Sequence, residues 1–131
     1  MDVITAYLYG SLDNNIHMKL PKGFKMPEVC NSDRRDLYSV KLCRSLYGLK
    51  QSGRMWYKRL SEYLLKNWFQ NDPICLCVFI KRFGSQFIII VIDVNDLNII
   101  GTTNELSEIV NYFKKEFEMK DLGKTKLCLG L

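Results

Sequence analysis

The sequence predicts an α+β domain built on an antiparallel sheet, and three observations lead to that prediction. Apolar stretches of strand character occur in pairs around short turns, and two further segments are amphipathic with helical spacing. These elements are interspersed without the strand–helix–strand rhythm of a parallel sheet. A chain of 131 residues, 47% hydrophobic and 25% charged, is long enough to bury a core as one domain.

The first half of the chain predicts a loop, a short strand and a helix. Residues 21–36 are rich in Pro, Gly and charge, which is typical of a long loop. The alternation of YSVKL at residues 38–42 indicates a strand. A helix is expected near residues 54–67, with Ser52 as its N-cap. Its apolar residues at helical spacing are Trp56, Leu60, Tyr63 and Leu64.

Two hairpins follow. ICLCVFIKR, residues 74–82, predicts a strand that turns at residues 83–85 and pairs with the segment from Gln86 onward. That second segment opens FIIIVIDVNDLNIIG, residues 87–101, which is nearly a mirror image about Val94-Asn95. A tight turn is expected there because Asn tolerates a positive φ.

The pairing about Val94-Asn95 predicts which side chains are neighbours in the second hairpin. It sets Asp93 beside Asp96, and it also pairs Ile92 with Leu97 and Ile90 with Ile99. The unbroken apolar run from Phe87 to Ile92 predicts a strand in the middle of the sheet, covered on both faces.

The last helix is expected near residues 103–118. Thr102 and Glu105 have the spacing of a capping box. Apolar residues on one helical face follow, namely Leu106, Ile109, Val110, Phe113 and Phe117. The lysine-rich segment 120–124 comes next, and residues 126–131 predict the start of another strand.

Charge and cysteine usage narrow the functional class. The net charge of +5, with a pI near 9.0, favours an anionic partner such as nucleic acid. An odd number of cysteines and no signal peptide indicate free thiols in a reducing intracellular compartment, cytoplasm or nucleus, rather than secretion. We interpret Cys75 and Cys77 as structural thiols and not as zinc ligands. No apolar run is long enough to span a bilayer, so no membrane partner is expected.

The acidic centre of the second hairpin has several interpretations. A solvated polar turn is the simplest, and an EF-hand loop is excluded because Asn98 stands where glycine is needed. A serine or cysteine triad lacks support, since the lone His17 has polar neighbours. A carboxylate at Asp2 and the Gly/Lys/Ser-containing segment 45–52 favour nucleotidyl transfer, which needs metal-binding carboxylates and a phosphate-binding loop.

Four blocks of the sequence together resemble one known family. They are DVITAYLYGSLDNNIHMKLPKGF, KLCRSLYGLKQSGRMWYKRL, DPICLCVFIKRFGSQFIIIVIDVNDLNIIG and FKKEFEMKDLGKTKLCLGL. In this order they closely resemble the copia-type retrotransposon reverse transcriptase, over essentially the whole chain. The resemblance implies that residues 1–131 are one truncated domain, a partial right-hand polymerase palm with part of the fingers, whose catalytic-type hairpin packs against helices.

The resemblance assigns metal-binding roles to three positions. Asp2 matches the first metal-binding aspartate, and Val3 is implied to offer its backbone carbonyl. The hairpin matches the family's Tyr-Val-Asp-Asp turn, so Asp93 stands at the tyrosine, Asn95 at the first aspartate and Asp96 at the second. The implied catalytic positions are therefore Asp2, Asn95 and Asp96, with Mg²⁺ as cofactor.

The resemblance also implies the substrates and how they are bound. They are an RNA or DNA primer–template and a deoxynucleotide. Tyr7 matches the aromatic gate that excludes a ribose 2′-hydroxyl, and Tyr47, Gly48 and Lys50 match the segment beside the incoming nucleotide and template. Residues 120–124 fall in a block where the family places a lysine near the leaving pyrophosphate. The last residues match the start of the primer-gripping hairpin.

Three departures from the family pattern predict a degenerate active site. Asn95 replaces a carboxylate, and an amide is a poorer ligand for a hard dication. Asp93, where the family has tyrosine, restores a negative charge nearby, but it lies on the flank of the strand, where its side chain need not point at the metal. Asp2 is the second residue, so the strand leading to it, much of the fingers and the thumb are expected to be missing. Residual activity, a non-catalytic basic domain that binds nucleic acid or protein, and a decayed reading frame are the alternatives.

Overall fold

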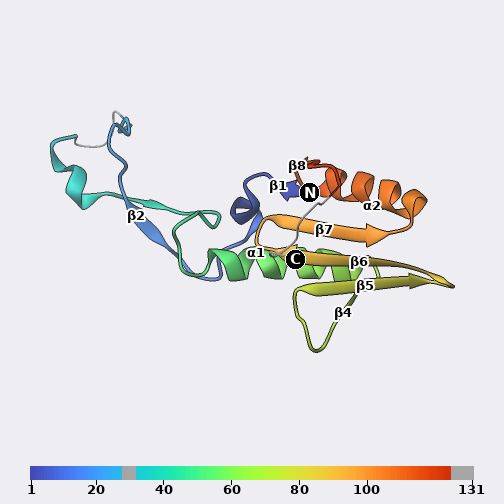
Figure 1. Cartoon of the computed structure of the whole chain (residues 1–131). Coiled ribbons are helices and arrows are strands. Elements are labelled where there is room, and N and C mark those ends of the chain that lie inside the picture. Colours follow the sequence, from blue (N-terminus) through green and yellow to red (C-terminus); the bar gives the residue numbers. More distant parts are fainter. Residues whose placement is uncertain (28–31, 125–131) are drawn as a thin grey trace.

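The computed structural model describes residues 1–27 and 32–124, and it confirms an α+β fold with an antiparallel sheet. Six strands form the main sheet, and two longer helices accompany it (Figure 1). In spatial order the strands are β4 (Gln70–Asn71), β5 (Val78–Phe83), β6 (Gln86–Asp93), β7 (Asp96–Gly101), β1 (Asp2–Val3) and β8 (Met119–Lys120). The predicted strand for residues 126–131 lies outside the described residues.

Both helices contribute to one core on one face of the sheet. Helix α1 spans Ser52–Lys66 and helix α2 spans Thr103–Glu116, close to the two predicted helices. Alternate residues of β6 (Ile88, Ile90 and Ile92) are buried in the same cluster as apolar residues of both helices. The helix residues of that cluster are Trp56, Leu60, Leu64, Ile109 and Phe113.

The opposite face of the sheet carries no such layer in the described structure. Strand β6 does lie in the middle of the sheet, as predicted, but it is not covered on both faces. Phe87 is 48% exposed and Ile100 is 53% exposed, and both belong to the helix-free face. The apolar run therefore reflects a strand with one fully buried face and one partly open face.

The second hairpin has the predicted register and the predicted two-residue turn at Val94-Asn95, but the backbone conformation of that turn differs from the expected one. Asp93 pairs with Asp96, and the pairs Ile92–Leu97 and Ile90–Ile99 follow. The positive φ falls on Val94, at 52°, and not on Asn95, so that prediction was wrong. A positive φ at the first central residue is typical of a type II′ turn, and it is held here by contacts of the Val94 carbonyl described below.

Two local predictions were wrong because side chains bind backbone groups. Strand β5 begins at Val78 and not at residue 74, since the Asp72 carboxylate accepts hydrogen bonds from the amides of Ile74 and Cys75 and so forms a turn. Ser52 is the first helical residue rather than the cap, and its hydroxyl donates to the carbonyl of Leu46.

The start of α2 confirms the predicted position of its cap but not the capping box. Thr102 is the N-cap residue, yet no side-chain hydrogen bond caps the helix there. Glu105 leaves its Oε2 buried without a hydrogen-bond partner. The helix nevertheless presents Ile109 and Phe113 to the core as its spacing predicts.

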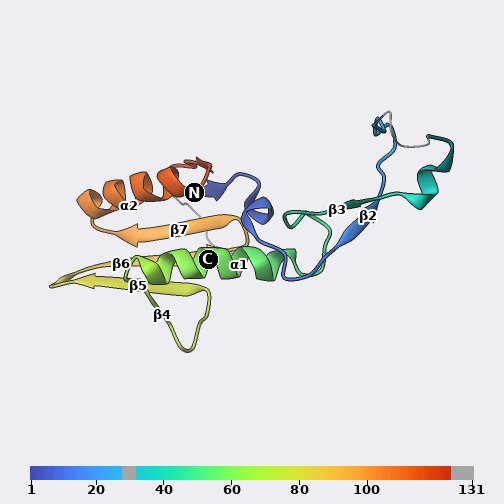
Figure 2. The same ribbon diagram turned by 180° about the vertical axis from the view of Figure 1, so that it is seen from behind.

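A separate two-stranded arm precedes α1. Strands β2 (His17–Lys19) and β3 (Ser39–Lys41) pair with each other and extend away from the main sheet (Figures 1 and 2). Strand β3 lies within the predicted strand at residues 38–42, and His17 is exposed. The predicted loop at 21–36 contains a short 3-10 segment, Ser32–Leu37, while residues 28–31 lie outside the described structure. Across the described ranges, no helix has the length and apolarity to cross a membrane.

Candidate functional site

A row of charged residues crosses four neighbouring strands at the hairpin end of the sheet. Asp93 on β6 is directly opposite Asp96 on β7. Asp96 is opposite Asp2 on β1, and Asp2 is opposite Lys120 on β8. Side chains directly opposite each other in an antiparallel sheet lie on one face, with about 5 Å between their Cβ atoms. Three carboxylates and one ammonium group therefore share one face of the sheet.

This charged row lies on the face opposite the helices. The residues next to its members, Ile92, Leu97 and Val3, are buried in the core, and Met119 packs against the core. Because successive side chains alternate between the two faces, the charged residues point to the helix-free side. Like charges placed directly opposite each other destabilise a sheet, so the row costs stability in the absence of a neutralising cation.

The short strand β1 is held firmly on the hairpin side. The amide of Val3 donates to the carbonyl of Asn95 at 2.9 Å, and the amide of Leu97 donates to the carbonyl of Met1 at 2.7 Å. The amino group of Met1 donates in turn to the carbonyl of Leu97 at 2.9 Å. Asp2 is thus fixed between β7 and β8 although it is the second residue, contrary to the expectation that its strand is missing.

The tip of the hairpin is fixed from the other side by helix α1. The indole Nε1 of Trp56 donates to the carbonyl of Val94 at 2.7 Å. Val94 is β-branched and holds a φ of 52°, a conformation that costs about 1–3 kcal/mol outside glycine. The hydrogen bond from buried Trp56 and the one that Asn95 accepts from β1 keep the turn in this conformation.

The side chain of Asn95 faces an aromatic pair. Its Nδ2 lies 3.4 Å from the hydroxyl of Tyr47, and its Oδ1 is buried without a hydrogen-bond partner. Tyr47 stacks on Tyr7 with ring centroids 4.4 Å apart and an interplanar angle of 29°. Asn95 therefore contacts Tyr47, which contacts Tyr7, and the resemblance assigns all three residues to catalysis or nucleotide binding.

Hydrogen bonds and one close approach position the Tyr47 segment. The hydroxyl of buried Ser45 donates to the carbonyl of Tyr7, and the Ser45 amide donates to the carbonyl of Gly10 at 3.0 Å. A Cβ at Gly10 would lie only 2.8 Å from Cβ of Met55, so only glycine lets α1 come this close. Sequence reasoning missed Ser45 and Gly10, because these contacts are tertiary.

The other two residues of the predicted nucleotide segment are exposed. Gly48 has a φ of +94°, which favours glycine, and Lys50 follows in the turn that leads into α1. The structure thus brings Tyr7, Tyr47 and Asn95 together and leaves Gly48 and Lys50 at the surface.

The donor groups at the row do not fit a centre for two divalent cations. Hard cations prefer several anionic oxygens, and a two-metal site needs carboxylates that bridge or flank both ions. Asp2, Asp93 and Asp96 supply carboxylates along the row, but the amide of Asn95 carries no charge and faces Tyr47. Within residues 1–27 and 32–124, no three His, Cys, Asp or Glu side chains converge closely enough to hold a metal ion.

Comparison with known proteins decides the family. A family model described as reverse transcriptase (RNA-dependent DNA polymerase) matches residues 1–131. The chain belongs to the reverse transcriptase family. No solved structure matches it significantly.

The most informative relatives of this reverse transcriptase chain come from transposons. It is 36% identical over 137 residues to the retrovirus-related Pol polyprotein from transposon TNT 1-94 of Nicotiana tabacum, covering 100% of the chain and 10% of that protein. It is 32% identical over 132 residues to the Pol polyprotein from transposon RE1 of Arabidopsis thaliana, covering 100% of the chain and 9% of that protein. The chain is thus a copia-type reverse transcriptase domain that spans about a tenth of the length of these relatives.

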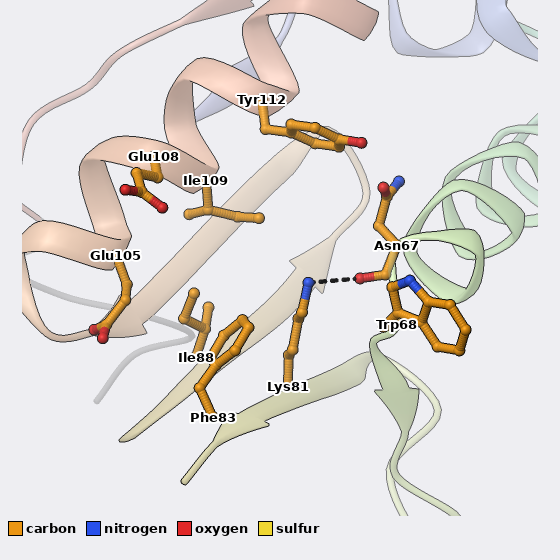
Figure 3. Close-up of a pocket in the computed structure, with 9 residues that line it drawn as sticks. All are labelled: Asn67, Trp68, Lys81, Phe83, Ile88, Glu105, Glu108, Ile109 and Tyr112. Atoms are coloured by element: carbon orange, nitrogen blue, oxygen red, sulfur yellow. Dashed lines mark hydrogen bonds between the residues drawn. The ribbon is translucent and has the colours of Figure 1, made fainter. Parts of the chain in front are cut away.

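A cavity on the helix side of the reverse transcriptase domain lies away from the charged row. It has a volume of about 340 Å³ and sits between β5, β6 and the two helices (Figure 3). The Lys81 ammonium group donates to the carbonyl of Asn67 at 2.9 Å, next to the exposed indole of Trp68. None of its lining residues is one that the family resemblance assigns to catalysis or nucleotide binding.

Proposed function

We propose that this chain is a palm fragment of a copia-type reverse transcriptase whose metal site is degenerate and which does not polymerise DNA as it stands. The observation that carries this proposal is the position of Asn95. It occupies the hairpin position where the family has a catalytic aspartate, its amide is neutral, and its side chain faces Tyr47. An uncharged amide that faces Tyr47 is a poor substitute for a carboxylate.

The remaining residues support descent from a polymerase site. In the family, a primer 3′-hydroxyl attacks the α-phosphate of a deoxynucleotide and releases pyrophosphate, with magnesium ions supplying the charge that this transfer requires. In this chain Asp2 and Asp96, which match two of the family's metal-binding aspartates, are paired on neighbouring strands, and this supports the proposal. Tyr7 and Tyr47, which match aromatic residues of the family's nucleotide site, stack on each other, and this supports the proposal as well.

Cation binding tests the proposal directly. We expect the native chain to bind Mn²⁺ weakly, and Asn95→Asp to bind it roughly tenfold more tightly, equivalent to about 1.4 kcal/mol, because the variant adds one anionic ligand beside the row. The measurement is an Mn²⁺ titration followed by electron paramagnetic resonance. Adding Asp2→Asn to the variant should cancel the gain. Equal affinity of the native chain and Asn95→Asp would overturn the proposal of a degenerate site.

A second candidate function is non-catalytic binding of nucleic acid, and the charge distribution favours it. Residues 14–27 and 37–61, which contain both strands of the arm and most of α1, have no acidic residue. Their basic residues are Lys19, Lys22, Lys25, Lys41, Arg44, Lys50, Arg54, Lys58 and Arg59. Arg54 and Arg59 are paired with Asp13 and Glu116, and the positive charge of the other seven residues attracts a phosphate backbone independently of its base sequence.

Salt dependence tests this binding. We expect weak, sequence-independent binding to a primer–template duplex that decreases as salt rises, because lysine contacts with phosphates release counterions. Lys19→Ser with Lys41→Ser, on the arm, should reduce the slope of log affinity against log salt by about 2, at about 0.9 for each lost phosphate contact. Lys66→Ser with Lys115→Ser, exposed on the helices, is the matched control and should leave the slope unchanged. Tight binding that persists at high salt would contradict this function.

A further inference from the structure

Two cysteine side chains meet between β4 and β5. The Sγ atoms of Cys75 and Cys77 are 3.1 Å apart. Cys75 is exposed and Cys77 is partly exposed, so small molecules in solution can reach the pair. In the part of the chain that the structure describes, no third His, Cys, Asp or Glu joins them in a metal-binding group. The two thiols therefore form a neighbouring pair that small molecules can reach.

The backbone around the two thiols is fixed on three sides. The Asp72 carboxylate accepts hydrogen bonds from the amides of Ile74 and Cys75, each at 2.8 Å. The carbonyl of Leu76 accepts from the hydroxyl of Tyr57 at 2.6 Å and from Nδ2 of Asn71 at 2.8 Å.

The third anchor joins this turn to the hairpin. The carbonyl of Cys77 accepts from the amide of Ile92 at 2.8 Å, where β5 starts to pair with β6. Because the fold already orders these residues, bringing the sulfurs together costs little further conformational entropy. Each thiol is therefore present at a high effective concentration relative to the other.

We propose that Cys75 and Cys77 form a reversible disulfide site that reacts with low-molecular-weight disulfides. The Cys75 thiolate attacks one sulfur of the small disulfide, forms a mixed disulfide and releases one small thiolate. The Cys77 thiolate then attacks Cys75 Sγ, closes the intramolecular disulfide and releases the second small thiolate. The two protein thiols are oxidised and one small disulfide is reduced to two thiols, which take up the two protons.

The environment of each thiol orders these steps. Cys75 is the more exposed sulfur and is the one that meets the external disulfide. The hydrogen bond with Cys75, followed by partial burial and the nearby Cys75 and Asp93 charges, raises the pKa of the Cys77 thiol. In the reduced pair this raised pKa makes the Cys77 thiol a poor first nucleophile, so Cys77 acts second, as the resolving thiol. Once Cys75 carries the mixed disulfide, the Cys77 thiol must lose its proton to attack, so closure should speed up as pH rises.

A peptide-mass experiment tests the proposal on the full chain. Trypsin releases residues 67–81 as one peptide that contains Cys75 and Cys77 and no other cysteine. After treatment with oxidised glutathione and alkylation, we expect this peptide to lose two hydrogen atoms and to resist alkylation. The closed form should exceed the glutathione adduct by about tenfold. The reason is that attack of Cys77 on the mixed disulfide within the fixed turn is faster than removal of glutathione by a thiol from solution. Dithiothreitol should restore both thiols.

Variants separate the pair from single reactive cysteines. Cys77→Ser should stop at the glutathione adduct of Cys75, since the resolving thiol is gone, and circular dichroism should show that the fold is kept. The exposed Cys43 provides an internal control, because its own tryptic peptide should carry glutathione without closing. A wild-type 67–81 peptide that keeps two free thiols, or accumulates the glutathione adduct as Cys77→Ser does, would overturn the proposal.

Discussion

Replacing Trp56 by alanine is expected to lower the free energy of unfolding by about 3–5 kcal/mol, which is a large share of the stability of a small domain. Trp56 is 1% exposed, and its ring and that of Phe117 are nearly perpendicular, with centroids 5.4 Å apart. It also donates the hydrogen bond that holds the carbonyl of Val94 at the hairpin tip. The substitution therefore opens a cavity between α1 and the sheet and also leaves that carbonyl without its buried donor. Urea denaturation followed by circular dichroism measures the change.

Two further substitutions separate packing from the hydrogen bond. Trp56→Phe keeps an aromatic ring but removes the N–H group, so it should cost about 1–3 kcal/mol and speed amide exchange in the hairpin. Leu65→Ala changes an exposed residue of the same helix and should stay within about 0.5 kcal/mol of the native chain. A cost below about 1 kcal/mol for Trp56→Ala would show that Trp56 does not support the hairpin as described.

The longer elements could be predicted from sequence because their signals are local. The spacing of Trp56, Leu60 and Leu64 fixes the buried stripe of α1, and the mirror symmetry about Val94-Asn95 fixes the register of β6 and β7. The sheet strands β1, β4 and β8 have two residues each, too few for any period to be visible. They exist only because longer neighbours pair with them, so tertiary structure alone defines them.

In the candidate site, too, some features have a local sequence signal and others depend on tertiary structure. The resemblance placed Asp2, Asn95 and Asp96 at one site, and strand pairing does set Asp2 beside Asp96. The direction of the Asn95 side chain depends on Tyr47, which lies on a loop 48 positions away in the sequence. The stacking of Tyr47 on Tyr7 is likewise a tertiary contact without a local sequence signal. A motif therefore identifies which residues belong to a site, while packing decides where their side chains point.

Restoring the hairpin carboxylate is expected to leave the 131-residue chain unable to extend a primer. Asn95→Asp returns the missing charge, but the new side chain starts from a position that faces Tyr47. It also joins Asp93, Asp96 and Asp2 in a group of like charges that repel one another, which favours displacement of one of these side chains. A reacting group displaced by about 1 Å can cost roughly a hundredfold in rate. The single change is therefore insufficient even though it should improve cation binding.

Recovery of activity is expected only when the surroundings of the site are restored together. Asp93→Tyr removes the carboxylate that lies directly opposite Asp96. The surroundings can be supplied by adding, on both sides of residues 1–131, the flanking segments of the tobacco transposon polyprotein, of which this chain covers 10%. We expect magnesium-dependent deoxynucleotide incorporation on an RNA template from this extended Asn95→Asp, Asp93→Tyr chain, and none from the native chain or from Asn95→Asp alone. Adding Asp2→Asn to the extended chain should abolish it. Incorporation by the native chain would overturn the degenerate-site proposal, whereas incorporation by Asn95→Asp alone would show that one neutral amide at the hairpin is the whole defect.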